Sequence, residues 1–205
     1  MFYISKVKLV SITLLVLFLF VFKNGYSQDA RFYHSKGIAH WNGERYDLSE
    51  ENYRKAVWLE PNNLHYRTSL AQILAKRNRY KEAQHEFLQC IGKDSTYVPA
   101  YRLSGWHFYK VGQYRNALRR FEKGLKFECS SGNSREMYRG IGETYAALLK
   151  TEGLDSVETN RMFEAFEIFV SKEIDEEFSK EAIAFLQKMK PLRPKSFKAK
   201  WFYKE

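Results

Sequence analysis

The sequence predicts an all-α fold built from helical hairpins, and three observations support this prediction. Similar residue types recur with a period of 34 positions, as in the small residues Gly37, Ala71 and Gly105. Within each copy the apolar residues follow helical spacing. The two apolar runs of a copy are separated by a short polar stretch, such as "KRNRY" at 76–80. Each copy is therefore predicted to be two antiparallel helices joined by a tight turn.

The period is present in six columns of the sequence, and each column holds related residues in all three copies. Besides the small residues above, these columns are Tyr46, Tyr80 and Tyr114; Ser49, Ala83 and Ala117; Tyr53, Phe87 and Phe121; Ala56, Cys90 and Gly124; Val57, Ile91 and Leu125. Self-similarity at a fixed period is the signature of a repeat architecture. The small residues are expected where two helices approach closely, with the large aromatic residues filling the space beside them.

Helical periodicity is clearest in the second copy. Its two apolar stripes, one on each helix, are Tyr66, Leu70, Ile73 and Leu74, then Ala83, Phe87 and Ile91. In the first copy, Pro61 stands where the second helix is predicted to end, since proline does not continue a helix.

These positions resemble the pattern of the tetratricopeptide repeat (TPR) family, whose repeats are helix pairs with small and aromatic residues at set places. The matching residues are Tyr33, Gly37, His40, Ser49, Tyr53, Ala56 and Pro61 in 30–63; Leu70, Ala71, Leu74, Ala83, Phe87 and Cys90 in 64–97; and Tyr101, Gly105, Phe108, Ala117, Phe121 and Gly124 in 98–131. Lys36 and Ser104 replace the leucine that is usual in the pattern. The resemblance implies a right-handed solenoid of three clear repeats.

A divergent fourth hairpin is predicted over residues 135–172. Its two helices are expected to bury Tyr138, Ile141, Gly142 and Tyr145, then Met162, Phe163, Phe166, Phe169 and Val170. Asp155 and Glu158 have the spacing of a capping box before the second of these helices.

A C-terminal capping helix is predicted over 175–190, starting at Asp175 and stopping at Pro191. Its charged residues can face water while the apolar ones lie largely beneath: Phe178, Ile183, Phe185 and Leu186. A polar outer face is what a solenoid needs at its end.

Residues 1–27 have the composition of a secretory signal peptide. Two lysines precede the apolar run 9–22, and Gly25 and Ser27 occupy the small-residue positions before a cleavage site. The alternative is an uncleaved anchor, although a bilayer span needs about 20 apolar residues. We therefore expect an exported protein, periplasmic or secreted, with inner-membrane anchoring as the alternative.

The net charge of +10 does not indicate a nucleic-acid partner. The positive charge is concentrated in the leader and in the tail 188–205, which leaves the body 28–187 nearly neutral. Nucleic-acid-binding domains carry a basic footprint on the body itself. No nucleic-acid partner is expected.

No catalytic constellation, cofactor loop or metal-ligand cluster is recognisable in the sequence. The five histidines form no His-x-x-x-His pair, and the isolated pair His85 and Cys90 lacks further ligands. Cys90 and Cys129 are predicted to stay unpaired because the repeat register separates them. Glu50 and Glu51 are predicted to lie on a solvated face near a helix start. The sequence thus predicts a non-enzymatic protein without cofactor or metal.

The resemblance implies a partner-binding groove lined by the first helix of each repeat. The residues carried onto this groove are Arg31, His34, Trp41, Gln72, Lys76, Arg102, Trp106, Tyr109, Lys110 and Arg139. His34 and Ile38 stand where some family members use a carboxylate clamp, so a chaperone C-terminal tail is not the expected ligand.

The third repeat concentrates positive charge and aromatic residues, which anchor interfaces well. We hypothesise a groove for an acidic, partly extended partner segment, centred on Arg102, Trp106, Tyr109 and Lys110. The alternative is that Trp106 and Tyr109 pack against the neighbouring repeat.

The tail 191–205 alternates lysines with aromatic residues. This composition suits an anionic membrane surface, but the tail could equally fold back onto the acidic segment 158–181. The overall prediction is a non-catalytic protein–protein interaction module or assembly scaffold. A membrane-anchored accessory or regulatory subunit of an envelope enzyme complex is the alternative.

Overall fold

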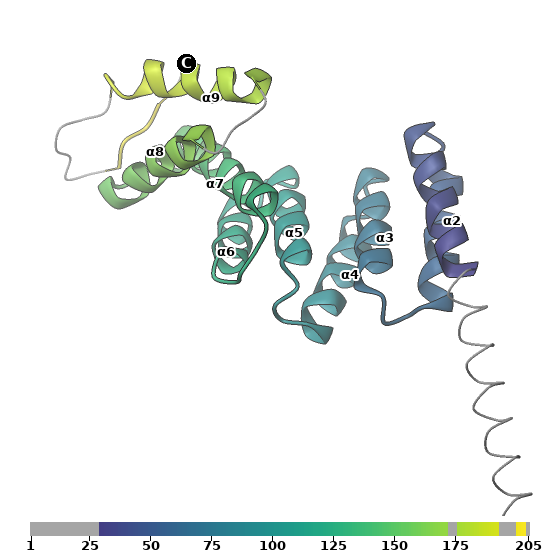
Figure 1. The fold of residues 1–205 in the computed structure, drawn as a ribbon. Helices are drawn as coiled ribbons and strands as arrows, with labels where there is room; N and C mark the ends of the chain where they lie inside the picture. Colours follow the sequence, from purple (N-terminus) through teal and green to yellow (C-terminus); the bar gives the residue numbers. More distant parts are fainter. Residues whose placement is uncertain (1–28, 172–175, 193–199, 204–205) are drawn as a thin grey trace, which may run out of the picture. The chain divides into compact units, whose positions relative to one another are not determined.

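The computed structural model describes residues 29–171, 176–192 and 200–203 (Figure 1). Regular structure in these residues is helical, apart from one isolated β-bridge. This confirms the all-α prediction. The chain divides into two compact units between Glu86 and Phe87, and each unit is described by itself. The predicted leader 1–27 lies outside the described residues.

The N-terminal unit contains a helix over residues 29–42, α2 (Tyr46–Leu59), α3 (Leu64–Lys76) and the first turns of α4 (Tyr80–Lys93). The first helix and α2 form a hairpin. Its closest approach is at Gly37, where an added Cβ would lie 2.6 Å from the ring of Tyr53. This is the small-residue contact that the 34-residue period predicts.

The side chain of Asn63 caps α3 by accepting hydrogen bonds from the backbone nitrogens of His65 (3.1 Å) and Tyr66 (3.3 Å). The exposed Pro61 lies in the turn just after α2, as predicted. Pro61 therefore marks the end of α2, and Asn63 marks the start of α3.

His34 lies inside the N-terminal unit, where only 6% of it is exposed. Its Nε2 shares a 3.0 Å hydrogen bond with Ser69 Oγ, and its ring lies 4.6 Å from that of Tyr66 and 4.8 Å from that of His65. Burial, and secondarily the charge of His65, lower the pKa of His34 to about 4. The folded unit therefore holds this histidine neutral.

The prediction that Glu50 faces solvent is wrong. Only 4% of Glu50 is exposed, and its carboxylate forms ion pairs with Arg54 of α2 and with Arg77 and Arg79 of the α3–α4 turn. Burial opposes ionisation, but the hydrogen bonds from Arg54 and Arg79 outweigh it and lower the pKa of Glu50. Glu50 is thus the buried centre of an ion-pair cluster whose arginines are partly exposed.

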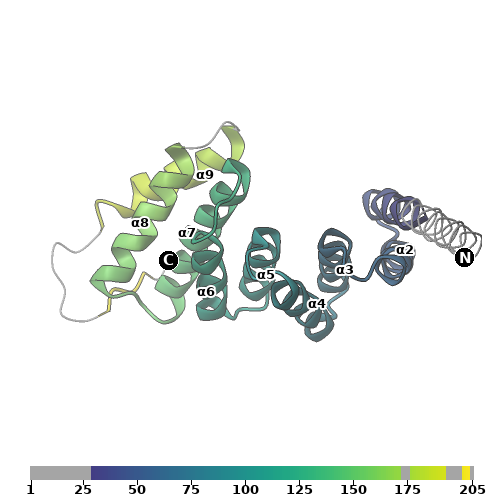
Figure 2. The same cartoon turned by 60° about the horizontal axis from the view of Figure 1, so that its bottom comes forward.

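Within the described residues, the C-terminal unit contains the rest of α4 and five further helices. These are α5 (Val98–Lys110), α6 (Tyr114–Gly124), α7 (Ser131–Thr151), α8 (Ser156–Ser171) and α9 (Glu176–Met189). The α5–α6 and α7–α8 pairs pack as hairpins, α7 also packs on α5 and α6, and α9 packs on α8 (Figure 2). In the α5–α6 turn, Gly112 has φ 75°, a conformation that favours glycine.

Phe121 of α6 connects three helices of this unit. A Cβ added at Gly105 of α5 or at Gly140 of α7 would lie 2.4 Å from its ring. The ring is fully buried. A second close contact joins the α7–α8 hairpin, because a Cβ at Gly142 would lie 2.8 Å from the ring of Phe166.

The divergent hairpin has the predicted capping box. The backbone nitrogen of Glu158 donates to Asp155 Oδ1 (2.8 Å), and that of Asp155 donates to Glu158 Oε2 (3.2 Å). Its first helix begins at Ser131, four residues before the predicted start, because Ser130 Oγ caps the backbone nitrogen of Asn133 (3.3 Å). Residues 130–134 are mostly Ser and Gly, so the apolar pattern of the sequence does not indicate this earlier helix start.

The buried face of α9 agrees with the prediction in part, because it contains Phe185 and Leu186 but not Ile183. Ala182 and Met189 are buried and Phe185 and Leu186 are partly buried, whereas Ile183 is 38% exposed. Asp175 and the side chain of Phe178 lie outside the described residues. The buried positions 182, 185, 186 and 189 follow the i, i+3, i+4, i+7 spacing of one helical stripe, and 183 falls beside that stripe.

The described part of the tail returns to the C-terminal unit. The backbone of Trp201 forms an isolated antiparallel bridge with Leu154, with N···O distances of 2.7 and 2.8 Å. The backbone nitrogen of Tyr203 also donates to the carbonyl of Leu149 (3.4 Å). These residues therefore contact the end of α7 at Leu149 and the α7–α8 connection at Leu154. The residues 193–199, on which the membrane hypothesis mainly rests, lie outside the described residues.

Cys90 is buried, Cys129 is partly buried, and no disulfide bond joins them. This confirms the prediction that they do not pair.

We expect Gly105→Ala to destabilise the C-terminal unit by about 1–3 kcal/mol, because the buried ring of Phe121 has no room to give way to a Cβ. Gly132→Ala is the matched control, since nothing lies within 4 Å of its added Cβ. Urea unfolding followed by circular dichroism measures both variants. Equal stability of the two would contradict the packing argument.

We expect His34 to make the N-terminal unit less stable in mild acid. The pKa of His34 is about 4 in the fold and 6.5 when unperturbed, so the unfolded chain binds a proton first as the pH falls from 6.5 towards 4. Stability is therefore lost in this window, by on the order of 1–3 kcal/mol. In His34→Phe, the midpoint of urea unfolding should change less between pH 7 and pH 4.5 than it does in the wild type. The exposed control variant His85→Gln should keep the wild-type pH dependence. An unchanged pH dependence would argue against a neutral, buried His34.

Candidate functional site

The predicted groove residues fall into two sets, one in each unit. The N-terminal set is Arg31, His34, Trp41, Gln72 and Lys76, and the C-terminal set is Arg102, Trp106, Tyr109, Lys110 and Arg139.

In the N-terminal set, Arg31, Gln72 and Lys76 are exposed and Trp41 is half-buried. Trp41 and Lys76 come together on the ring of Tyr46, which sequence reasoning assigned only to packing. Trp41 meets Tyr46 edge-on at 6.0 Å, and Lys76 Nζ lies 5.2 Å from the ring of Tyr46. His34, by contrast, is buried in the core and hydrogen-bonded to Ser69.

In the C-terminal set, Trp106 of α5 is the centre of an aromatic and cationic cluster. Its ring lies 5.6 Å from that of Tyr109 and 5.4 Å from that of Phe121, both edge-on. The guanidinium of Arg139, from α7, lies 4.7 Å from the same ring. Such a cation–π contact stabilises by roughly 0.5–2 kcal/mol. Trp106 thus packs against the neighbouring helix α6 through Phe121, and the predicted groove residue Arg139 contacts its ring.

The indole nitrogen of Trp106 is buried without a hydrogen-bond partner, although the residue as a whole is only half-buried. A buried N–H group without a partner costs stability. The aromatic packing around this ring outweighs that cost in the folded unit.

Arg102, one turn inside α5, and Lys110, its last residue, differ in environment. Arg102 Nε donates to Asn133 Oδ1 of α7 (2.9 Å), and burial lowers the pKa of Arg102 while the charge of Glu136 raises it. Lys110 is exposed. Only Lys110 of this pair presents its charge fully to solvent.

Much of the positive charge of the third repeat serves the fold rather than the groove. Arg115 forms ion pairs with Glu152 and Glu158 near the α7–α8 connection. Arg120 lies over the ring of Phe108 (5.8 Å), and Lys123 lies over that of Tyr101 (5.6 Å). The charge excess seen in the sequence is therefore distributed around the hairpin.

Two acids of α7 lie beside the groove cation Arg139. Arg139 Nη2 is 3.0 Å from Glu136 Oε2, and its Nη1 is 3.9 Å from Glu143 Oε1. Burial raises the pKa of Glu143; the charge of Arg139 lowers it, and Glu136 and Glu181 raise it further. The acids make this end of the surface electrostatically mixed, which was not predicted.

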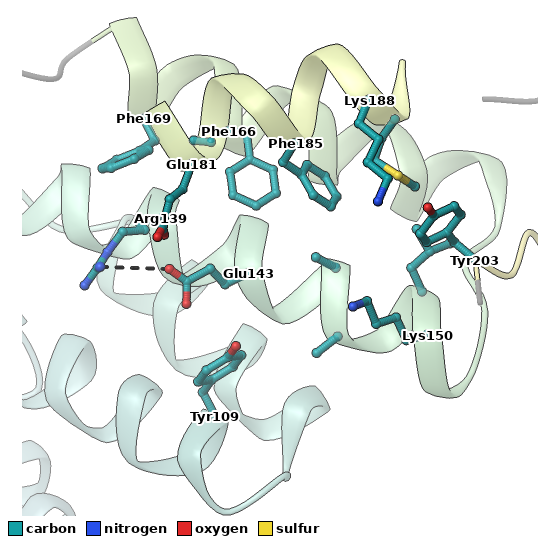
Figure 3. A pocket seen from close by; sticks show the side chains of 15 residues that line it. Tyr109, Arg139, Glu143, Lys150, Phe166, Phe169, Glu181, Phe185, Lys188 and Tyr203 are labelled. Atoms are coloured by element: carbon teal, nitrogen blue, oxygen red, sulfur yellow. Dashed lines mark ion pairs between the residues drawn. The ribbon is translucent and has the colours of Figure 1, made fainter. Parts of the chain in front are cut away.

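A cavity of about 480 Å³ opens next to this cluster, and Tyr109 and Arg139 form part of its lining (Figure 3). Helices α5, α7, α8 and α9 and the tail residue Tyr203 contribute to its walls. The apolar part of the lining includes Leu149, Phe166, Phe169, Phe185 and Met189. Because α9 and Tyr203 complete it, no local sequence pattern could have indicated this cavity.

The described residues offer no recognisable site for metal chemistry: none of their His, Cys, Asp and Glu side chains form a group of three or more that could hold an ion. None of the helices within these residues is both long and apolar enough to cross a membrane.

Comparisons with known proteins agree with this fold. The family model "Tetratricopeptide repeat" matches residues 30–63. Human protein O-mannosyl-transferase TMTC1 is 27% identical over 92 residues, which are 45% of this chain and 10% of that protein. The chain therefore spans about a tenth of the length of the curated relative that it matches.

Among solved structures, MamA is similar with a TM-score of 0.61 and 17% identity, over 81% of this chain and 85% of MamA. The pilF protein of Pseudomonas aeruginosa gives a TM-score of 0.53 and 14% identity, over 84% and 95% of the two chains. The first TPR of Spaghetti (RPAP3) gives 0.53 and 21%, over 60% and 94%. At these identities the likeness concerns the fold alone. The chain has the all-α helical-hairpin fold of tetratricopeptide repeat proteins, and residues 30–63 match the repeat of that family.

Proposed function

We propose that this protein is an exported, non-catalytic interaction module whose C-terminal unit binds a short segment of a partner protein. The binding surface is formed by α5 and α7, with Trp106, Tyr109 and Arg139 at its centre. The observation that carries this proposal is the cavity of about 480 Å³ directly beside these residues. Aromatic and arginine side chains next to a concave, mostly apolar pocket are the typical anchors of an interface.

The fold supports binding rather than catalysis. Tetratricopeptide repeats are pairs of helices that stack to present an extended surface for other proteins. One structure with the same fold, the first TPR of Spaghetti (RPAP3), is bound to the HSP90 peptide SRMEEVD. No specific observation favours the alternative of an accessory subunit in an envelope enzyme complex.

The charges of the surface suggest where an acidic partner residue would lie. Lys110 is exposed at the end of α5 and is the cation best placed to meet an acidic side chain. Towards α7, Glu136 and Glu143 partly neutralise Arg139. The proposed partner segment is therefore acidic where it passes the end of α5 but not opposite Glu136 and Glu143 of α7, because acidic residues there would meet like charge.

Site-specific crosslinking tests the proposed surface. A photo-crosslinking amino acid at exposed Lys110 should capture a defined partner in cells, whereas the same group at Lys126, exposed just after α6, should not. The partner is then identified by mass spectrometry and purified. Arg139→Gln should weaken its binding about tenfold or more, as expected for a central interface residue.

The control for this loss is Arg119→Gln, which changes an exposed arginine on α6. It should leave the dissociation constant within about twofold of wild type. Equal capture at Lys110 and Lys126, or equal effects of the two arginine substitutions, would argue against this surface.

Export is proposed from the N-terminal sequence. If the leader is removed after Ser27, the mature chain begins at Gln28. Intact-mass measurement of the protein purified from its natural host should show this start. A mass that includes residues 1–27 would instead support the anchored form, in which the apolar run 9–22 is retained.

The tail 191–205 is proposed mainly as part of the C-terminal unit. Trp201 pairs with Leu154, and Tyr203 contributes to the cavity wall. An anionic membrane surface is a second proposed contact of the tail, because its lysines would be attracted to anionic lipid headgroups.

A further inference from the structure

The two longest walls of the cavity carry the same charge pattern. Helix α7 presents Glu143 and, seven residues later, Lys150; helix α9 presents Glu181 and, seven residues later, Lys188. All four residues line the cavity. Seven residues are two helical turns, so each acid and its lysine are separated by about 10 Å along the helix axis.

The like charges of the two helices lie at the same ends of the cavity. In Figure 3, Glu143 and Glu181 lie together on the side of Arg139, and Lys150 and Lys188 lie on the side of Tyr203. The electrostatics of Glu143 agree with this, since burial and, to a smaller extent, the charge of Glu181 raise the pKa of Glu143. The cavity therefore has an acidic end and a basic end.

Among the residues that line the cavity, the acidic end holds two carboxylates and one cation (Figure 3). Arg139 is its cation, but Arg139 lies closer to Glu136 (3.0 Å) than to Glu143 (3.9 Å). A half-buried carboxylate is stabilised by a nearby opposite charge. A cationic group entering between Glu143 and Glu181 would supply that charge.

The middle of the cavity is apolar. Phe166 of α8 and Phe185 of α9 lie between the charged ends with their tilted rings 4.8 Å apart (Figure 3), and Ala146 and Ala147 of α7 also line the cavity. These apolar side chains line a space that an apolar side chain can fill.

We propose that the cavity binds an extended stretch of the partner protein with a cationic side chain at the Glu143/Glu181 end, an acidic side chain at the Lys150/Lys188 end, and an apolar side chain between them. This inference rests on the proposed function and gives the chemistry of the partner. An extended chain in the polyproline II conformation advances about 3.1 Å per residue with three residues per turn, so charged side chains three positions apart point the same way and are separated by about the distance between the two ends of the cavity. The order of charges also sets the direction in which the segment runs.

Synthetic tetrapeptides test this proposal directly. The probes are acetyl-Lys-Phe-Ala-Glu-amide and two neutralised forms, in which either the lysine or the glutamate is replaced by glutamine. Binding to the full chain is measured by NMR chemical-shift titration. The doubly charged peptide should bind at least about fivefold more tightly than either neutralised form, because only it complements both ends.

Variants of the protein assign each charge to its end. Glu143→Gln and Glu181→Gln should remove the advantage of the peptide's lysine, and Lys150→Met and Lys188→Met should remove that of its glutamate. Glu181, Lys150 and Lys188 are exposed, so their variants are expected to fold even if Glu143→Gln does not. Glu164→Gln, an exposed acid on α8 outside the cavity, is the matched control and should behave as wild type.

Equal affinity for the three peptides, or a variant pattern that does not separate the two ends, would overturn the inference. So would tighter binding of octanoate than of the doubly charged peptide, because that result indicates a fatty-acid site. If the crosslinked partner loses affinity with Arg139→Gln but not with Glu181→Gln and Lys150→Met, this inference fails while the proposed interaction module stands. If the peptides bind as expected but Lys110 captures no partner, the proposed function fails instead.

Discussion

The close fit of one aromatic ring against glycines on two neighbouring helices is the contact on which the C-terminal unit depends. The ring of Phe121 fills the space that Gly105 leaves on α5 and that Gly140 leaves on α7. Even one added methyl group at either glycine would overlap the ring. Since protein cores pack as densely as crystals, this contact sets the separation of α5 and α7, and with it the surface on which the proposed site lies.

The site is a consequence of that helix spacing. Trp106 of α5 packs against Phe121 of α6, and the guanidinium of Arg139, from α7, lies over the ring of Trp106. Neither contact is local in the sequence. The same spacing places Asn133 within hydrogen-bonding distance of Arg102, so a residue suggested for partner binding is already engaged within the unit. What stays open to a partner is the cavity beside these contacts and the exposed charge at the end of α5.

Polar groups inside the N-terminal unit follow a different logic. Glu50 and His34 are both nearly completely buried, but one is kept charged by arginines and the other is kept neutral. A buried carboxylate is tolerated when hydrogen-bonded cations surround it, whereas a histidine with a hydroxyl and aromatic neighbours loses its proton more easily. Neither state could be predicted from the residue alone, because it depends on which side chains the neighbouring helices supply.

The sequence by itself determined the hairpins, because helical periodicity, glycines opposite aromatics and the capping box at Asp155 and Glu158 are local or strictly periodic signals. Only the tertiary structure decided which of the periodic positions are accessible to solvent. His34 is buried in the core, whereas Ile183 of α9 lies on the surface. It also decided the cavity, whose walls come from four helices and Tyr203. The physical reason is that burial and pocket shape depend on contacts between residues far apart in the chain, and a single sequence carries no direct record of those contacts.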